Sequence, residues 1–226
     1  MGRGGQKNDL AREAQKVTFH EEVLSPAQER LLARLGAFAS EQGFYLGGGT
    51  AVALYLGHRR SDDLDWFTAC RLGDPLVLAA RAGTAGLTIE TAEPGLGTLH
   101  AVIGGVRVSF FEYPYPNVAE EVYWTKFGLK LASLDDLACM KLAAVAQRGS
   151  RKDFVDVDAL ATDYRPLVEL LALYKRKYSF SDISHVLIGL SYFDDAEDEP
   201  MPEMLRDTPW EEIKRRLRAW VKSAAV

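Results

Sequence analysis

The sequence predicts an α+β fold, a mixed α/β arrangement in which a small mixed sheet packed by helices precedes a mostly helical part. Three observations support this prediction. Residues 44–68 show a strand, glycine turn, helix and strand order, residues 99–116 show a glycine-centred hairpin, and a helical pattern begins at Ser133. We therefore expect an α/β core with an N-terminal helix over residues 1–130 and a helical C-terminal part over 131–226 that completes the site.

The core begins with a polar, glycine-containing lead-in of about 17 residues. A helix is expected from Ser25 to Gly43, because Ser25 is a good N-cap, Pro26 suits the first helical position and Gln28 completes a capping box. The next segments are expected to be a strand over residues 44–46, a tight turn at Gly47–Gly49, a helix over Thr50–Leu56 and a strand over Asp63–Thr68.

The later elements follow from caps and breakers. Residues 74–92 predict a helix and then a strand, and Gly104 and Gly105 centre the hairpin that Pro114 and Pro116 close. Ser133 with Asp136, and Ser150 with Asp153, predict two capping boxes. From Pro166 onwards we expect short helices broken by the acidic segment DDAEDEPMP, and a last helix that runs from the Thr208 cap to Trp220.

Composition limits the class of protein. The chain has 226 residues, 47% of them hydrophobic, which is typical of one globular unit rather than a disordered chain. We expect a cytoplasmic protein without a membrane segment, because no apolar run approaches the roughly 18–20 residues of a span and the first residues lack a signal peptide's apolar region. Cys70 and Cys139 lie outside any CxxC pattern, which disfavours a disulfide scaffold or thiolate zinc site. The net charge of −5 disfavours a generally basic nucleic-acid coat.

Two carboxylates carry the strongest chemical signal. Asp63 and Asp65 alternate on one strand and so share a face, where a divalent cation would relieve their repulsion. A DxD pair alone is weak evidence, and an isolated GGG favours a structural turn. Here, however, a glycine turn precedes Asp63 by 13 intervening residues and opens into a helix whose first amides can hold a phosphate. The combination predicts an NTP with one or two Mg²⁺ ions, although no P-loop GK[ST] follows.

The segment GGGTAVALYLGHRRSDDLDWF resembles the signature of the DNA polymerase β-like nucleotidyltransferase superfamily. More closely, it is similar to the nucleotidyl transferase family of AbiEii/AbiGii toxins, whose members carry GGTAL, LGHR and SxDLDFF in this order. A second block, MKLAAVAQRGSRKDFVDVDAL, resembles that family's later helical motif, and LSYFDDAEDEPMP resembles a segment of one branch. The resemblance covers about residues 26–205.

The resemblance implies a site and a reaction. Gly48, Gly49, Thr50 and Ser61 would contact the nucleotide, and Asp63 and Asp65 would hold the metal. Lys141 and Asp156 match the essential pair of the second block, with Asp153 close by. Lys141 and Arg148, seven positions apart on one helical face, would neutralise the triphosphate. The implied reaction is transfer of an NMP from an NTP to a hydroxyl of tRNA or a protein, and the implied partner is a cognate antitoxin.

Several residues keep two interpretations at this stage. Asp153 is equally well explained as the capping-box partner of Ser150, and Lys141 as an ordinary surface lysine. Arg59 and Arg60 form either a solvated loop or a phosphate clamp, while His58 is expected to make a polar contact that fixes its loop.

Ser109 stands where many nucleotidyltransferases place a third carboxylate, which leaves Asp156 or Glu112 as candidates for the general base. The main alternative to an enzyme is therefore a catalytically weak nucleotide-binding module with a regulatory or interaction role. A third hypothesis is an assembly protein that uses Tyr192, Phe193 and the acidic residues 194–199 as its contact surface.

Overall fold

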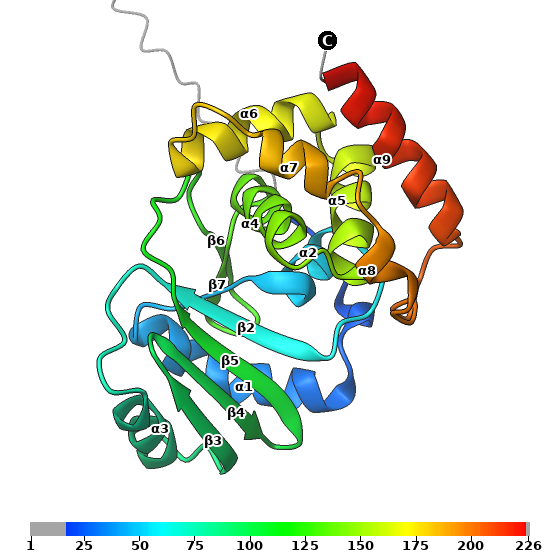
Figure 1. Ribbon diagram of the computed structural model, residues 1–226. Coiled ribbons are helices and arrows are strands. Elements are labelled where there is room, and N and C mark those ends of the chain that lie inside the picture. Colours follow the sequence, from blue (N-terminus) through cyan, green and yellow to red (C-terminus); the bar gives the residue numbers. More distant parts are fainter. Residues whose placement is uncertain (1–16, 225–226) are drawn as a thin grey trace, which may run out of the picture.

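The computed structural model describes residues 17–224, so the expected lead-in lies almost wholly outside the described residues. A seven-stranded mixed sheet carries helices on both faces (Figure 1). Its strands are β1 (Tyr45–Leu46), β2 (Asp63–Thr68), β3 (Ile89–Gly95), β4 (Thr98–Ile103), β5 (Val106–Glu112), β6 (Val122–Trp124) and β7 (Leu129–Leu131).

The order of strands in the sheet is β3-β4-β5-β2-β1-β7-β6. At its centre β2 pairs in parallel with β5 and antiparallel with β1, and β1 pairs in parallel with β7. The register sets Asp63 opposite Arg107, Asp65 opposite Ser109 and Phe67 opposite Phe111. One face of these two strands therefore changes from polar to aromatic along their common direction.

The helices are η1 (Glu21–Val23), α1 (Pro26–Glu41), α2 (Gly48–Leu56), α3 (Pro75–Thr84), α4 (Leu134–Gln147), α5 (Arg151–Asp163), α6 (Leu167–Tyr178), α7 (Ser184–Gly189), α8 (Asp194–Glu197) and α9 (Trp210–Ala224). Figure 1 shows α1 and α3 on the side of the sheet opposite α4 and the later helices. None of the helices within residues 17–224 combines the length and apolarity needed to cross a membrane.

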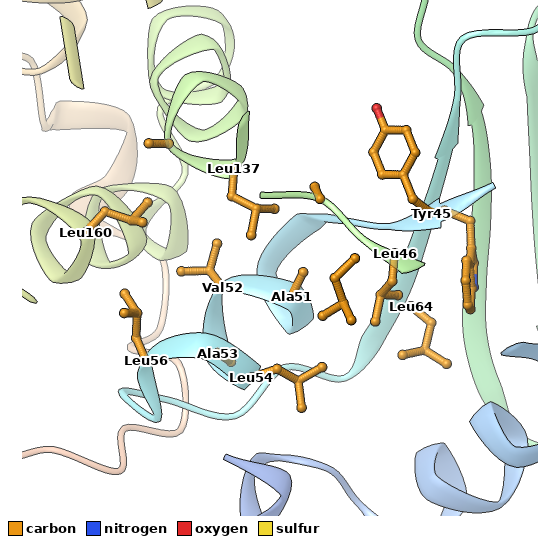
Figure 2. Packing of buried hydrophobic residues seen from close by; sticks show 14 of the residues in the cluster. Tyr45, Leu46, Ala51, Val52, Ala53, Leu54, Leu56, Leu64, Leu137 and Leu160 are labelled. Atoms are coloured by element: carbon orange, nitrogen blue, oxygen red, sulfur yellow. The ribbon is translucent and has the colours of Figure 1, made fainter. Parts of the chain in front are cut away.

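Helix α2 lies inside the molecule between the sheet and the C-terminal helices. Figure 2 shows Val52 of α2 beside Leu137 of α4, with Leu160 of α5 nearby, while Leu46 and Leu64 lie on the sheet side. All five side chains are fully buried. Because α2 is apolar all round, neighbouring elements pack against it on every side. Its N-terminus, which meets β2, therefore has a fixed position.

The expected elements are largely present. The capping box of α1 is confirmed, with Ser25 and Gln28 bonded reciprocally, and the hairpin turns at Gly104 and Gly105. Helix α2 begins at Gly48 rather than Thr50, and α9 continues past Trp220 to Ala224. The sequence prediction misses β6 and β7, because three-residue strands are too short to show a clear alternation.

Within residues 17–224, every strand ends by Leu131 and helices follow. The boundary expected near residue 130 stays a prediction, because the pairing of β1 with β7 and the packing of α2 on α4 and α5 join the two parts.

Part of the acidic segment packs against the chain itself, whereas Tyr192, Asp194 and Asp195 are exposed, so the contact-surface hypothesis stays a prediction. Phe193 is 2% exposed and packs on Phe154 and Trp210. The carbonyl of Ala196 accepts a hydrogen bond from Arg151 at 2.8 Å, and the Glu197 carboxylate pairs with Lys214 at 2.5 Å. Phe193, Ala196 and Glu197 thus take part in the packing of the C-terminal helices.

Two helical glycines give a matched test of this packing. A Cβ at Gly36 of α1 would overlap the carbonyl oxygen of Phe127, whereas a Cβ at Gly83 of α3 meets nothing within 4 Å. We expect Gly36→Ala to lower the free energy of unfolding by about 1–3 kcal/mol through overpacking. Gly83→Ala should raise it by about 0.5–1 kcal/mol, because alanine favours the helix. Urea unfolding of both variants measures this, and a neutral Gly36→Ala would contradict the packing of α1 on the 124–129 turn.

Candidate active site

The glycine turn lies directly against the two carboxylates. Gly47 caps α2, and its N–H donates to the carbonyl of Asp65 at 2.8 Å. Gly48 has a φ of 63°, and a Cβ there would overlap the Asp65 carboxylate. A Cβ at Gly49 would overlap the guanidinium of Arg59. Only glycine therefore allows the start of α2 to approach both side chains at this distance.

Thr50 and Ser61 hold the turn from behind. The Thr50 hydroxyl donates to the main-chain carbonyl of Asp63, and Thr50 is 1% exposed. The carbonyl of Ser61 accepts from Gln28 Nε2 at 2.7 Å, and the Ser61 hydroxyl lies beside Gly49. The Thr50 hydroxyl thus joins α2 to β2, and the nucleotide contact expected of Thr50 stays a prediction.

Asp63 and Asp65 share one face of β2, as their alternation predicts, and both line a groove with Gly48. Asp63 pairs with Arg107 at 2.5 Å and lies 3.8 Å from Lys152 Nζ. Among residues 17–224 no side chain donates a hydrogen bond to the Asp65 carboxylate. Burial raises the pKa of the Asp65 carboxyl above its ordinary value; Lys141 partly offsets this rise and Asp63 adds to it.

A buried ion network lies behind the turn. The Asp156 carboxylate accepts hydrogen bonds from Arg59 Nε at 2.7 Å, Arg59 Nη2 at 2.8 Å and His58 Nε2 at 2.8 Å, and it pairs with Lys141 Nζ at 2.6 Å. These four residues, His58, Arg59, Lys141 and Asp156, are at most 5% exposed. Burial alone would raise the pKa of Asp156, but Arg59, Lys141 and His58 outweigh it and hold the pKa well below its ordinary value.

Asp153 belongs to the same network, which corrects its capping interpretation. Ser150 makes no side-chain cap bond at the start of α5. The Asp153 carboxylate instead pairs with Lys141 Nζ at 3.0 Å and with Arg148 Nε at 2.7 Å. Two cations outcompete one backbone amide for this carboxylate, because charge-assisted bonds are the stronger ones.

The loop that follows α2 is fixed by the C-terminal part of the chain. Arg60 N donates to the carbonyl of Glu203 at 2.8 Å, and Leu205 N donates to the carbonyl of His58 at 3.0 Å. Arg59 also forms an isolated bridge with Met204. Arg59 is therefore neither solvated nor available as a phosphate clamp, whereas Arg60 pairs at the surface with Glu203 at 2.9 Å.

The groove has a volume of about 680 Å³ and runs along α4 over β2 and β5. At one end lie the carboxylates with Arg148 and Lys152; at the other end the wall is aromatic. The aromatic residues are Phe67, Phe111, Tyr113, Tyr115, Tyr174, Tyr178 and Phe180. The hydroxyls of Tyr113 and Tyr178 bond each other across the groove's far end.

A family model described as nucleotidyl transferase AbiEii toxin, type IV toxin–antitoxin system, matches residues 30–112 and 102–222. The chain belongs to the AbiEii family. It is 34% identical over 200 residues to an uncharacterised protein of Aquifex aeolicus, which covers 88% of this chain and 96% of the relative. This family consists of nucleotidyl transferases, so the chain is a member of an enzyme family.

Two solved structures share the fold. The nucleotidyltransferase toxin MenT4 of Mycobacterium tuberculosis aligns with a TM-score of 0.57 and 14% identity, covering 87% of this chain and 82% of that one. JHP933 of Helicobacter pylori aligns with a TM-score of 0.54 and 17% identity, covering 90% and 92%. At this identity the likeness shows the fold alone.

The expected site residues of this AbiEii member fall into two groups, those that line the groove and those that are buried behind it. Gly48, Asp63, Asp65 and Arg148 line the groove, and Lys141 reaches its wall while its ammonium group is bonded to Asp153 and Asp156. Asp156 is 0% exposed and does not line the groove, so it is not placed to take a proton from a substrate there. Glu112, the other base candidate, accepts from Leu72 N at 3.2 Å and also lies outside the groove.

Sequence reasoning missed His100 and the aromatic wall. His100 lies on β4 opposite Ser109, whose own register partner on β2 is Asp65. The distance from His100 Nδ1 to Ser109 Oγ is 3.0 Å, and both residues line the groove. Alternation along the hairpin could have placed His100 on this face, but its pairing with Ser109 depends on the register.

The ion network predicts a large stability loss on neutralising Asp156. In Asp156→Asn the buried Arg59 and Lys141 lose their shared counter-charge, and we expect the free energy of unfolding to fall by roughly 3–5 kcal/mol. The matched control is Glu169→Gln, which removes an exposed pair with Arg165 at 3.4 Å and should cost less than about 0.5 kcal/mol. Urea unfolding measures both. Equal small effects would show that the network is not a structural element.

Proposed function

We propose that this protein transfers a nucleoside monophosphate from an NTP to an acceptor hydroxyl and releases pyrophosphate. The observation that carries the proposal is the contact of Gly48, at the start of α2, with the Asp65 carboxylate at the polar end of the groove. A helix N-terminus favours anionic phosphate oxygens, and two adjacent carboxylates favour a divalent cation. An NTP binds through its triphosphate together with a divalent cation, so this one ligand accounts for both the helix N-terminus and the carboxylates.

The triphosphate belongs at the polar end. The amides of Gly48 and Gly49 offer donors there, and Arg148 and Lys152 supply side-chain cations that are 56% and 47% exposed. Arg148 is held by Asp153 at 2.7 Å, which fixes its guanidinium beside the groove. Fixed charges of this kind stabilise a phosphoryl transition state without reorganising.

The donor set at Asp63 and Asp65 fits magnesium. No cluster of three or more His, Cys, Asp or Glu side chains suited to a metal occurs within the part of the chain that the structure describes. Two carboxylates are nevertheless the usual protein share for Mg²⁺, which takes its other ligands from water and substrate phosphates. When bound there, the ion supplies positive charge to the phosphate oxygens and to the attacking hydroxyl.

Lys141, Asp153 and Asp156 act in this proposal by positioning. Lys141 joins α4 to both aspartates of α5, and Asp156 holds Arg59, which packs under Gly49. The network thereby ties the glycine turn to Arg148 at the edge of the groove. The essential character that the family resemblance implies for Lys141 and Asp156 follows from this support rather than from contact with the reacting atoms.

The nucleobase belongs at the aromatic end. Tyr115 stacks edge-on against Tyr178 at 4.9 Å and is 44% exposed, so it presents ring surface to the groove. Aromatic side chains bind bases by stacking with little selectivity among them.

We propose the end of a tRNA as the acceptor, because Arg107, Arg148 and Lys152 gather at the polar end of an otherwise acidic chain. A protein hydroxyl is the other outcome of the assay below. Not all of the basic residues join this patch: Lys177 is buried against Asp136 at 2.7 Å, and Lys214 pairs with Glu197. Family membership further suggests an antitoxin partner.

The transfer reaction is tested with α-labelled NTPs, Mg²⁺ and total tRNA, with total cell protein as a second acceptor. We expect label transfer by the wild-type protein and a loss of at least about 100-fold in Asp63→Asn and Asp65→Asn, because each removes a charge at the reacting phosphate. Asp195→Asn makes the same chemical change on the exposed face of α8 and should keep full activity.

Ser109 in place of a carboxylate favours one competing function, a nucleotide-binding module without turnover. Tight NTP binding with no label on either acceptor would establish that module and overturn the transferase proposal.

The aromatic end predicts a separate effect on NTP affinity. Tyr115→Ala should weaken NTP binding by about 5- to 150-fold, the loss expected from one stacked base, while Tyr115→Phe should retain most of it. Tyr123→Ala removes a tyrosine that is 59% exposed on β6 and serves as the control. Equilibrium binding of a fluorescent NTP measures all three. Unchanged affinity in Tyr115→Ala would exclude the base from this end.

A further inference from the structure

A second hollow of about 280 Å³ lies beside the groove, on the face of β4 and β5. It shares four residues with the groove: Asp63, Asp65, His100 and Ser109. The residues that line this second hollow alone include Thr91, Glu93 and Arg107. The carboxylates therefore stand between two spaces, one of nucleotide size and one smaller, and His100 borders both.

The line from Asp65 to His100 is set by strand pairing. Asp65 of β2 is opposite Ser109 of β5, and Ser109 is opposite His100 of β4. Successive strands lie about 4.8 Å apart, so His100 is two strand spacings from Asp65, with the Ser109 hydroxyl between them. His100 is exposed, and the 3.0 Å contact of its Nδ1 with Ser109 Oγ fixes its ring.

We propose that the second hollow receives the acceptor and that His100 takes the proton of its hydroxyl, with Ser109 as the positioning residue. This inference rests on the proposed nucleotidyl transfer. When His100 Nδ1–H donates to Ser109 Oγ, Nε2 keeps its lone pair and is free to accept a proton. The pair fills the role for which the third carboxylate was expected, since Asp156 and Glu112 lie outside the groove.

The transfer exchanges one bond to the α-phosphorus for another. The acceptor oxygen forms a bond to the α-phosphorus, and its proton passes to His100 Nε2. The bond from the α-phosphorus to the bridging oxygen breaks, and pyrophosphate leaves with that electron pair. The phosphate oxygens keep their charge, and Arg148 and Lys152 lie at the same end of the groove to neutralise it.

The charged groups around His100 come from every neighbouring element. They are Glu93 from β3, Arg107 from β5, Asp63 and Asp65 from β2, Arg148 at the end of α4 and Lys152 from α5. Positive and negative groups are both present, so a pH profile must be compared between variants rather than interpreted for the wild type alone.

The test uses the full chain, total tRNA and the NTP that the wild type transfers. We expect His100→Gln to lower kcat by about 100- to 10,000-fold, the usual contribution of a general base. NTP affinity should stay within about twofold of wild type, and the melting temperature within about one degree. The pH–rate profile should differ in shape from that of the wild type. The control is His20→Gln, which changes a histidine bonded to Glu22 at 2.9 Å outside both hollows.

A second variant tests whether another base at this position can replace His100. Ser109→Asp places a carboxylate opposite Asp65, and in the His100→Gln background it should restore kcat at least about 10-fold, because a base is again within reach of the acceptor. Ser109→Ala should cost less than His100→Gln and add nothing to it.

The outcomes separate this inference from the proposed function. Loss of transfer in Asp63→Asn together with unchanged kcat in His100→Gln would overturn the role of His100 and leave the transferase intact. Failure of Ser109→Asp to rescue His100→Gln, with NTP binding retained, would likewise exclude a proton acceptor at this position. A wild-type protein that transfers no label would remove the proposed function itself.

Discussion

The structure depends on one buried charge. Asp156 neutralises Arg59 and Lys141 at once, and of these two cations only Lys141 also pairs with Asp153. Removing ions from water is costly, and the cost is recovered only when geometry and hydrogen bonding are complete. The bonds therefore make α4, α5 and the loop after α2 mutually dependent. The position of the glycine turn follows from this arrangement, because the Arg59 guanidinium occupies the space beside Gly49 that a side chain would need.

A second constraint is the register of the sheet. Because β2 and β5 are parallel and in step, polar residues face each other at one end and aromatic residues at the other. The antiparallel β4 then brings His100 to the polar end. A slip by one residue would turn every one of these side chains to the opposite face, where Leu64 and Trp66 are buried. The same buried residues that stabilise the sheet thus determine which residues reach the groove.

Local signals in the sequence predicted most of the helices and the central strands. The Ser25 cap, the alternation over Asp63–Thr68 and the hairpin at Gly104 and Gly105 act over a few residues, so a single sequence reveals them. The family resemblance added the grouping of the glycine turn with Lys141 and Asp156. Neither source gave the partners: Arg59 and Asp156 are 97 positions apart, and only the fold brings them together. For the same reason Asp153 looked like a cap, and His100 was not noticed.

The hydrogen bonds from residues 203–206 to the loop at His58 and Arg60 have a consequence for the timing of synthesis. A ribosome makes the glycine turn and both carboxylates first, and it makes the segment that holds the neighbouring loop only after all the strands and helices α4 to α8. Until then the backbone groups of His58 and Arg60 lack these partners, and Arg59 lacks its bridge to Met204. A nascent chain thus carries all its groove carboxylates long before it carries a finished site. For a member of a toxin family, this order makes completion of the site depend on the synthesis of residues 203–206.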